Sequence, residues 1–197
     1  TMQASDMPSK CAGRTASGRA FWVFGLVMIA GAAASSENDL RHQIEQNLVV
    51  PNEVRSVRFK WSRPPSILAL YFGASWCGPC HAFTPELIRI RAALRELGTD
   101  TDVVYVSLDE SELDMRRYMR SQEMPWPAID YRKLQSLPAV RTLGGIAPPN
   151  LVLIGQGGEV IANGWQGRRY TGLDPVLRAW LAEAKQSTSQ REPIHEK

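Results

Sequence analysis

The stretch Trp76-Cys77-Gly78-Pro79-Cys80 lies where the hydrophobic pattern of the chain changes its period. An uninterrupted apolar run, Ile67 to Phe72, precedes it and is typical of a buried strand. The apolar side chains that follow recur every three or four residues, at Phe83, Leu87, Ile90, Leu94 and Leu97. This spacing predicts one face of a helix. The two cysteines are therefore expected between a strand and a helix, a setting that favours a redox-active pair.

The position of Cys77 at the start of this helix favours its thiolate, the attacking species in thiol–disulfide exchange. Unpaired N–H groups and the positive end of the helix dipole stabilise an anion there. Cys80 follows one turn later, so its sulfur can reach that of Cys77. Pro79 suits a first turn, where its missing N–H costs no hydrogen bond, and Gly78 allows a substrate backbone to come close. The sequence thus predicts Cys77 as nucleophile and Cys80 as resolving thiol.

Three other uses of the cysteine pair remain as alternatives. A structural disulfide is one, although such bonds usually close longer loops. Half of a zinc site is another, although no second C-x-x-C or His pair follows at ligand spacing. The third is c-type haem attachment, because His81 completes the pattern C-x-x-C-H. In the redox hypothesis no bound metal or cofactor is needed, since the electrons reside on the two sulfurs.

Longer strings around the pair resemble the thioredoxin superfamily, and within it the tryparedoxin and nucleoredoxin branch. The strings are Leu70 to Cys77, Phe83 to Leu87, and Met124-Pro125-Trp126. The resemblance covers about residues 45 to 185. Gly78-Pro79 departs from the branch, which usually carries two prolines between its cysteines. Tyr71 stands where thioredoxins usually have a buried aspartate, as it does in the tryparedoxin branch, so the proton acceptor for Cys80 is left open.

The resemblance implies a thioredoxin fold of the α/β class, with a mixed central β-sheet flanked by helices on both faces. It also implies a cis-proline at Pro149, facing the cysteines, with Pro148 touching the backbone of the substrate. Trp76 is expected to shield one side of the sulfur pair.

The chain of 197 residues divides into three parts. Residues 1–34 combine basic residues, an apolar core at residues 21–30 and a small-residue cleavage site at residues 32–34, which together predict a signal peptide or an N-terminal membrane anchor. Residues 35–185 are the expected thioredoxin-like domain, and residues 186–197 a polar, disordered tail. This organisation predicts export to a bacterial periplasm, either free or tethered.

Further elements follow from local patterns. A short helix is expected at 40–48, an edge strand or hairpin arm at 54–61, strands at 102–108 and 151–154, and a hairpin partner at 159–162. Asp174-Pro175 opens a last helix whose expected apolar face carries Leu177, Trp180, Leu181 and Ala184. Trp126 is placed either at the rim of the active site or on the packed surface.

The sequence therefore predicts a thiol–disulfide oxidoreductase that reduces protein disulfides. The alternatives are an exported thiol oxidant or isomerase of the same fold, and a non-enzymatic binding module. Gly-Pro between the cysteines resembles reducing thioredoxins, so an exported reductant requires a membrane thiol electron donor. Nucleic acid is not an expected partner, because the net charge is only +3 and no basic stripe interleaved with aromatics is present.

Overall fold

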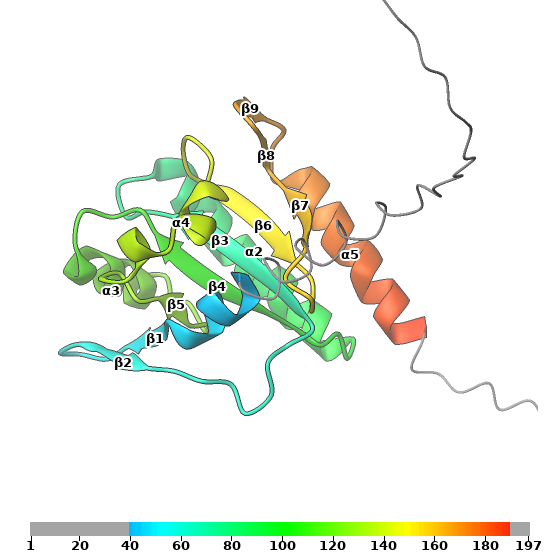
Figure 1. Ribbon diagram of the computed structural model, residues 1–197, viewed down its shortest axis with the longest axis horizontal. Coiled ribbons are helices and arrows are strands. Elements are labelled where there is room, and N and C mark those ends of the chain that lie inside the picture. Colours follow the sequence, from blue (N-terminus) through cyan, green and yellow to red (C-terminus); the bar gives the residue numbers. More distant parts are fainter. Residues whose placement is uncertain (1–39, 190–197) are drawn as a thin grey trace, which may run out of the picture.

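The computed structural model describes residues 40–189 (Figure 1). The predicted signal peptide or anchor, residues 1–34, lies outside these residues, as does the predicted tail beyond Ser189. Residues 40–46 are helical. The strands are β1 (Leu48–Pro51), β2 (Ser56–Arg58), β3 (Ile67–Gly73), β4 (Thr101–Ser107), β5 (Ala128–Ile129), β6 (Asn150–Ile154), β7 (Val160–Asn163), β8 (Trp165–Gln166) and β9 (Arg169–Tyr170). The helices are α2 (Gly78–Glu96), α3 (Glu112–Ser121), the short 3-10 helix η1 (Leu134–Ser136), α4 (Pro138–Thr142) and α5 (Asp174–Ser189).

Seven strands form one mixed sheet in the order β2-β1-β5-β4-β3-β6-β7. β3 pairs parallel with β4, and β4 with β5, whereas β6 runs antiparallel to β3. The continuous apolar run Ile67 to Phe72 lies in β3, an interior strand between β4 and β6, and all seven residues of β3 are buried. A strand covered on both faces shows such a run, because neither set of alternate side chains meets water.

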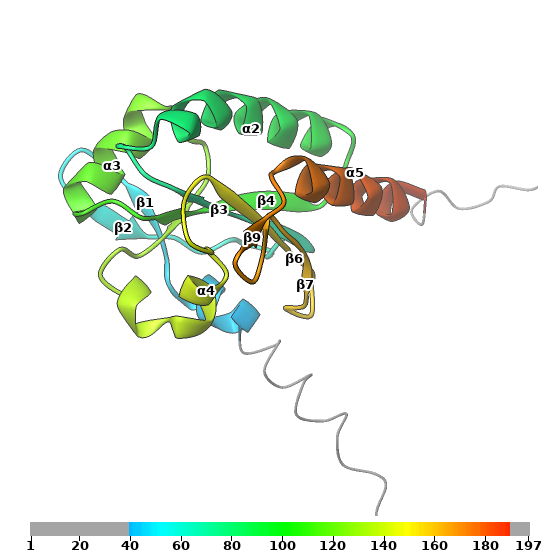
Figure 2. The ribbon, with the colours of Figure 1, turned by 90° about the horizontal axis from the view of Figure 1, so that it is seen from above.

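Helices cover both faces of the sheet (Figure 2). On one face α2, α3 and α5 bury one set of alternate strand residues, and on the other face the helix at 40–46, η1 and α4 bury the second set. In β3 the first set includes Ala69 and Tyr71, and the second includes Leu70 and Phe72. The predicted mixed sheet with helices on both faces is confirmed.

Most predicted elements are present, with shifted ends. The helix expected to reach Gly98 ends at Glu96 with Leu97 as its cap, and Gly98 has the positive φ of 78° that favours glycine after a helix. The predicted edge strand forms β2, which pairs with β1 as a hairpin at the edge of the sheet. The first arm of this hairpin was not predicted.

Three expectations were wrong. Trp126 was placed at the active-site rim or on the surface, but it is 3% exposed and packs in the core with α2 and α3. Leu181 was placed on the buried face of the last helix, but it is 47% exposed, and Val176 takes that face with Trp180. The tail was expected from residue 186, but α5 continues to Ser189. Once packing fixes the first turns of a helix, each further residue adds a hydrogen bond at little cost.

Candidate active site

The two cysteines lie at the junction of β3 and α2. Cys77 is the N-cap of α2, with extended backbone angles, and its Sγ accepts a hydrogen bond from the Cys80 N–H at 3.2 Å. Cys77 and Cys80 form a disulfide, with their Cα atoms 5.2 Å apart. The first turn of α2 contains no acidic side chain. The positive end of the helix dipole therefore acts on Cys77 without a neighbouring carboxylate in that turn to oppose it.

The residues around the disulfide differ sharply in exposure. Cys80 is fully buried and Cys77 is 3% exposed, whereas the Trp76 side chain is 61% exposed. Gly78 and Pro79 are exposed too, and no heavy atom lies within 4 Å of the point where a Cβ on Gly78 would sit. Pro79 occupies the first turn of α2, as predicted. A partner can therefore approach along the exposed side formed by Trp76, Gly78 and Pro79.

The proline loop leaves the sheet at the same edge as the cysteine loop. Phe72 near the end of β3 pairs with Asn150 at the start of β6, so Pro149 comes directly before the paired strand end. The Pro148-Pro149 bond is cis, as the resemblance implies. Two hydrogen bonds connect this loop to the β8–β9 hairpin. Trp165 Nε1 donates to the Ala147 carbonyl at 3.1 Å, and the Tyr170 hydroxyl donates to the Pro149 carbonyl at 2.9 Å. The sequence analysis missed both aromatic partners.

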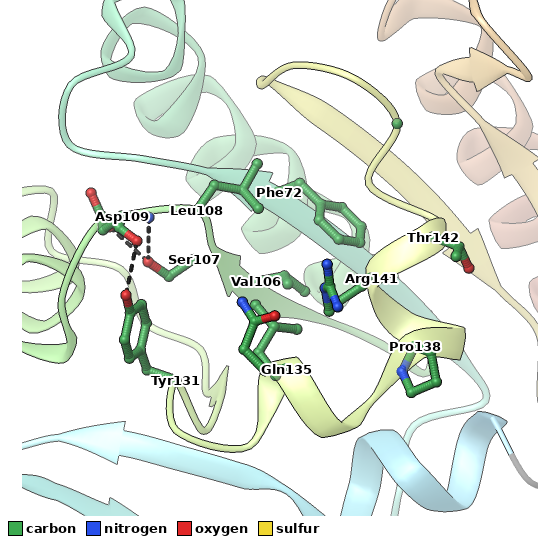
Figure 3. Close-up of a pocket in the computed structure, with 12 residues that line it drawn as sticks. Phe72, Val106, Ser107, Leu108, Asp109, Tyr131, Gln135, Pro138, Arg141 and Thr142 are labelled. Carbon is green, nitrogen blue, oxygen red and sulfur yellow. Dashed lines mark hydrogen bonds between the residues drawn. The ribbon is translucent and has the colours of Figure 1, made fainter.

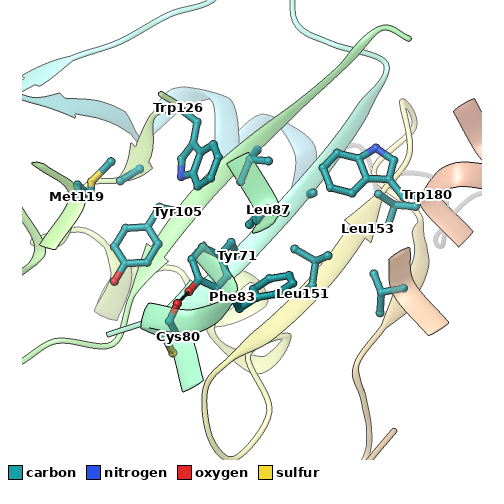
Figure 4. Close-up of a cluster of buried hydrophobic side chains, with 14 of the residues drawn as sticks. Tyr71, Cys80, Phe83, Leu87, Tyr105, Met119, Trp126, Leu151, Leu153 and Trp180 are labelled. Atoms are coloured by element: carbon teal, nitrogen blue, oxygen red, sulfur yellow. Dashed lines mark hydrogen bonds between the residues drawn. The ribbon is translucent and has the colours of Figure 1, made fainter. Parts of the chain in front are cut away.

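Behind Cys80 lies a buried network of hydroxyl groups. The Tyr71 hydroxyl lies 2.9 Å from Thr84 Oγ1 and donates to the Cys80 carbonyl at 3.3 Å, a contact drawn in Figure 4. Thr84 Oγ1 donates to the same carbonyl at 2.8 Å and lies 3.1 Å from the Tyr118 hydroxyl. Tyr71 thus contacts the backbone of Cys80 from the position where thioredoxins usually carry an acid.

Burial strongly raises the pKa of Tyr71, although its hydrogen bond with Thr84 acts in the opposite direction. The pKa of Tyr118 is also raised, chiefly by burial. A phenol with a raised pKa is not ionised near neutral pH, so Tyr71 cannot act as the base that receives the proton of Cys80. Its contribution is structural.

We expect Tyr71→Phe to leave the rate of disulfide reduction within about threefold of wild type, because the hydroxyl does not receive the proton of Cys80. A threefold change corresponds to less than about 1 kcal/mol of barrier. The free energy of unfolding should fall by about 1 kcal/mol, because the hydrogen bonds that the buried Tyr71 hydroxyl makes to Thr84 and to the Cys80 carbonyl are lost. Insulin-reduction kinetics and urea unfolding measure the two effects. A hundredfold loss of rate in a stably folded variant would show that the hydroxyl takes part in the chemistry.

The raised pKa also predicts how stability changes at alkaline pH. The phenol ionises more easily in the unfolded chain, so the unfolded state releases protons first and stability falls as the pH rises above about 10. Tyr71→Phe should weaken this alkaline loss, and because Tyr105 is also buried with a raised pKa, some loss should remain. Urea midpoints measured from pH 8 to 11 test this, and an unchanged slope in Tyr71→Phe would contradict it.

Asp109 is a buried carboxylate that holds the cysteine loop from the end of β4. It is 7% exposed, and its Oδ1 accepts a hydrogen bond from the Ser75 N–H at 2.6 Å. Oδ2 accepts from Ser107 Oγ at 2.7 Å and from the Tyr105 hydroxyl at 3.3 Å. The Asp109 carbonyl accepts from the Tyr131 hydroxyl at 3.1 Å. The sequence analysis missed this residue, although a polar side chain after a parallel strand marks the edge where sites form.

Asp109 also borders a groove of about 500 Å³ on the α4 side of the sheet (Figure 3). Phe72, Val106 and Leu108 contribute apolar side chains to its lining, and Arg141 and Gln135 contribute polar ones.

His81 is an exposed side chain in the first turn of α2, as expected, and the structure also gives it three neighbours. Its Nε2 lies 2.6 Å from the Ser75 carbonyl oxygen, and its Nδ1 lies 3.3 Å from Gln122 Nε2. Its ring packs edge-on against Tyr118, with centroids 4.9 Å apart. The nitrogen that would bind iron in a C-x-x-C-H haem site therefore faces a backbone carbonyl.

Comparisons with known proteins agree with this geometry. The sequence profile of the family described as "Thioredoxin-like" matches residues 65–160. Over 104 residues the chain is 36% identical to nucleoredoxin of Xenopus laevis, a match that covers 52% of this chain and 24% of that protein. The chain thus spans about a quarter of the length of that relative.

Solved structures with the same fold include two tryparedoxins. Tryparedoxin II from C. fasciculata is 28% identical with a TM-score of 0.52, covering 64% of this chain and 86% of that one. Tryparedoxin from Trypanosoma brucei is 27% identical with a TM-score of 0.51, covering 63% and 85%. With its mixed sheet and the cysteine pair at the start of α2, the chain belongs to the thioredoxin superfamily, in its tryparedoxin- and nucleoredoxin-like branch.

Proposed function

We propose that this protein is a thiol–disulfide oxidoreductase that reduces disulfides in partner proteins through Cys77 and Cys80. The observation that carries the proposal is the placement of Cys77 as the N-cap of α2, bonded to Cys80 one turn later. At this position the helix favours the thiolate of Cys77, and the buried Cys80 is within reach to complete the exchange.

The exchange proceeds in two steps from the reduced protein. The Cys77 thiolate attacks one sulfur of the partner disulfide, the partner S–S bond breaks, and its second sulfur leaves as a thiolate. Cys80 then loses its proton and attacks Cys77 Sγ, which breaks the mixed disulfide and releases the first partner sulfur. Two electrons have passed to the partner, and Cys77 and Cys80 end as the disulfide seen in the structure.

The surroundings of the pair supply the docking surface in this proposal. Trp76, Gly78 and Pro79 are exposed, and in this proposal the partner disulfide lies against them while Trp76 shields one side of the sulfur pair. Pro148 and Pro149 receive the partner backbone at the neighbouring strand end, the role that the resemblance implies. No metal or cofactor takes part, because the two sulfurs carry the electrons.

Reduction of insulin by the dithiothreitol-reduced protein tests the proposal. We expect turbidity from the released B chain to develop well ahead of the dithiothreitol control, in proportion to protein concentration. A protein that binds partner disulfides without accelerating their reduction would instead be a binding module. Rapid oxidation of reduced ribonuclease by the disulfide form would favour a thiol oxidant.

We also propose that the protein is exported to a bacterial periplasm and receives electrons from a membrane thiol donor. The basic and apolar pattern of residues 1–34 supports export. Within residues 40–189 no helix is long and apolar enough to cross a bilayer. The Gly78-Pro79 pair supports a reducing role, and outside the cytosol a reductant must be recharged.

Thiol trapping in living cells measures this electron flow. We expect alkylation to find Cys77 and Cys80 largely reduced, and to find them oxidised when membrane thiol transfer is blocked. N-terminal sequencing of the native protein should start near Ser35. An intact N-terminus in the cytosolic fraction would contradict export, and a pair that stays oxidised at steady state would contradict the direction.

A further inference from the structure

Two side chains hold the loop before Cys77, one at the N–H of Ser75 and the other at the carbonyl of Ser75. Asp109 Oδ1 accepts the Ser75 N–H, and the His81 imidazole lies at the Ser75 carbonyl, each at 2.6 Å. Asp109 comes from the end of β4 and His81 from the first turn of α2. One residue of the loop, two positions before Cys77, is therefore fastened to two separate elements.

The contacts of His81 indicate which of its nitrogens carries the hydrogen. A carbonyl oxygen only accepts, so Nε2 must be the donor to Ser75. Nδ1 can then accept from the Gln122 amide, 3.3 Å away on the C-terminal side of α3, while the Tyr118 ring packs against the imidazole. The side chain thus makes a directed hydrogen bond, and α3 holds its ring in the required orientation.

Asp109 is equally well fixed. Ser107 donates to its second carboxylate oxygen at 2.7 Å, and the Tyr105 hydroxyl, which also donates to the Gly73 carbonyl at 2.9 Å, lies 3.3 Å from the same oxygen. Both residues come from β4 in the centre of the sheet. Contacts from β4 thus hold the buried carboxylate at the position from which it accepts the Ser75 N–H. Removing it would leave that partly buried N–H without its acceptor, which costs free energy beyond the loss of the bond itself.

We propose that Asp109 and His81 are positioning residues for Cys77, and that their joint hold on Ser75 keeps Cys77 in the N-cap geometry that makes it reactive. This inference rests on the exchange proposed above. In that geometry the Cys80 N–H points at Cys77 Sγ, so a loop that drifts loses both this hydrogen bond and the alignment with the helix dipole.

The test measures the reactivity of Cys77 without any partner protein. The reduced protein is treated with iodoacetamide from pH 5 to 10, and peptide mapping separates Cys77 from Cys80 and Cys11. We expect His81→Leu to lower the alkylation rate of Cys77 at pH 7 by about tenfold or more and to shift its pH profile upward, because misplacement of a reacting group carries penalties of this size. His81→Gln should react at close to the wild-type rate, since its amide N–H can replace Nε2–H.

Asp109 is tested in the same way with a conservative pair. Asp109→Asn retains an oxygen that can accept the Ser75 N–H, and its NH₂ group can donate to the Ser107 hydroxyl oxygen while Tyr105 donates to Gly73. It should therefore stay closer to wild type than Asp109→Ala, which should behave like His81→Leu. Two matched controls should leave the profile unchanged. His42→Leu changes an exposed histidine in the helix at 40–46. Asp100→Ala removes a carboxylate that accepts from Ser66 at the opposite end of the sheet.

Equal alkylation profiles for His81→Leu and wild type would overturn the inference. So would equal losses in His81→Leu and His81→Gln, because the imidazole would then act by charge or packing and not by its hydrogen bond. His81 is exposed, so its variants should fold even where Asp109→Ala does not. A different result would refute the proposed function. If the wild-type protein has a reactive Cys77 but does not reduce insulin, the proposed function is wrong and the positioning role still holds.

Discussion

Cys77→Ser is expected to abolish insulin reduction, whereas Cys80→Ser should retain the first attack and accumulate mixed disulfides. Cys77 supplies the nucleophile, and removing the nucleophile from covalent catalysis typically costs at least about a thousandfold in rate. Cys80 acts only in the second step, so without it the partner stays bound to Cys77 Sγ. Turnover fails in both variants, but only one of them traps partners.

Non-reducing electrophoresis of each variant with a disulfide-containing protein distinguishes the two roles. We expect adducts that dithiothreitol dissolves from Cys80→Ser and none from Cys77→Ser. Cys11→Ser is the matched control, since Cys11 is the one cysteine of the sequence that the proposed exchange does not use. Adducts from Cys77→Ser alone would reverse the assignment of nucleophile and resolving thiol.

The parts of the site that the sequence predicted are those set by local pattern. Cys77 and Cys80 could be placed at a helix start because a buried strand and a helical face flank them within a few residues. Pro79 and Gly98 mark the two ends of α2 for reasons that also act locally, the missing N–H of one and the positive φ of the other. The cis bond at Pro149 came from the resemblance, because a single X-Pro pair does not reveal its isomer.

The contacts that the sequence could not reveal join distant segments. Asp109 meets Ser75 across 34 positions, and Gln122 meets His81 across 41. No periodicity encodes such pairs: the first arises because parallel strands bring their carboxyl ends to one edge, and the second because α3 packs beside the start of α2. Trp126 was misplaced for the same reason. Its two flanking prolines suggested an exposed loop, whereas the neighbouring backbone pairs with β4 and draws the indole into the core, where Pro127 accepts a hydrogen bond from Tyr105.

Trp180→Ala should cause the largest loss of stability among single changes in α5. The indole is fully buried between α5 and the sheet, within the cluster shown in Figure 4. Its Nε1 donates to Thr101 Oγ1 at 2.9 Å. Truncating a buried tryptophan to alanine typically costs about 3–5 kcal/mol, because apolar contacts are lost and a cavity remains. Thr101 still donates to the Ile67 carbonyl at 3.1 Å, so no buried hydroxyl is left without a partner.

Urea unfolding of the oxidised protein measures this loss, with Leu181→Ala as the matched control. Leu181 is the next residue along α5 but is 47% exposed, so its truncation should change the free energy of unfolding by at most about 0.5 kcal/mol.

Because α5 packs against β6, whose first residue follows Pro149, loosening the helix should also weaken docking at the proline loop. We therefore expect Trp180→Ala, where it remains folded, to raise the KM for insulin while Cys77 keeps its alkylation rate. If Trp180→Ala lowers the free energy of unfolding by less than about 1 kcal/mol, the space left by the indole collapses. If Trp180→Ala and Leu181→Ala lower it equally, the buried face of α5 has been misassigned.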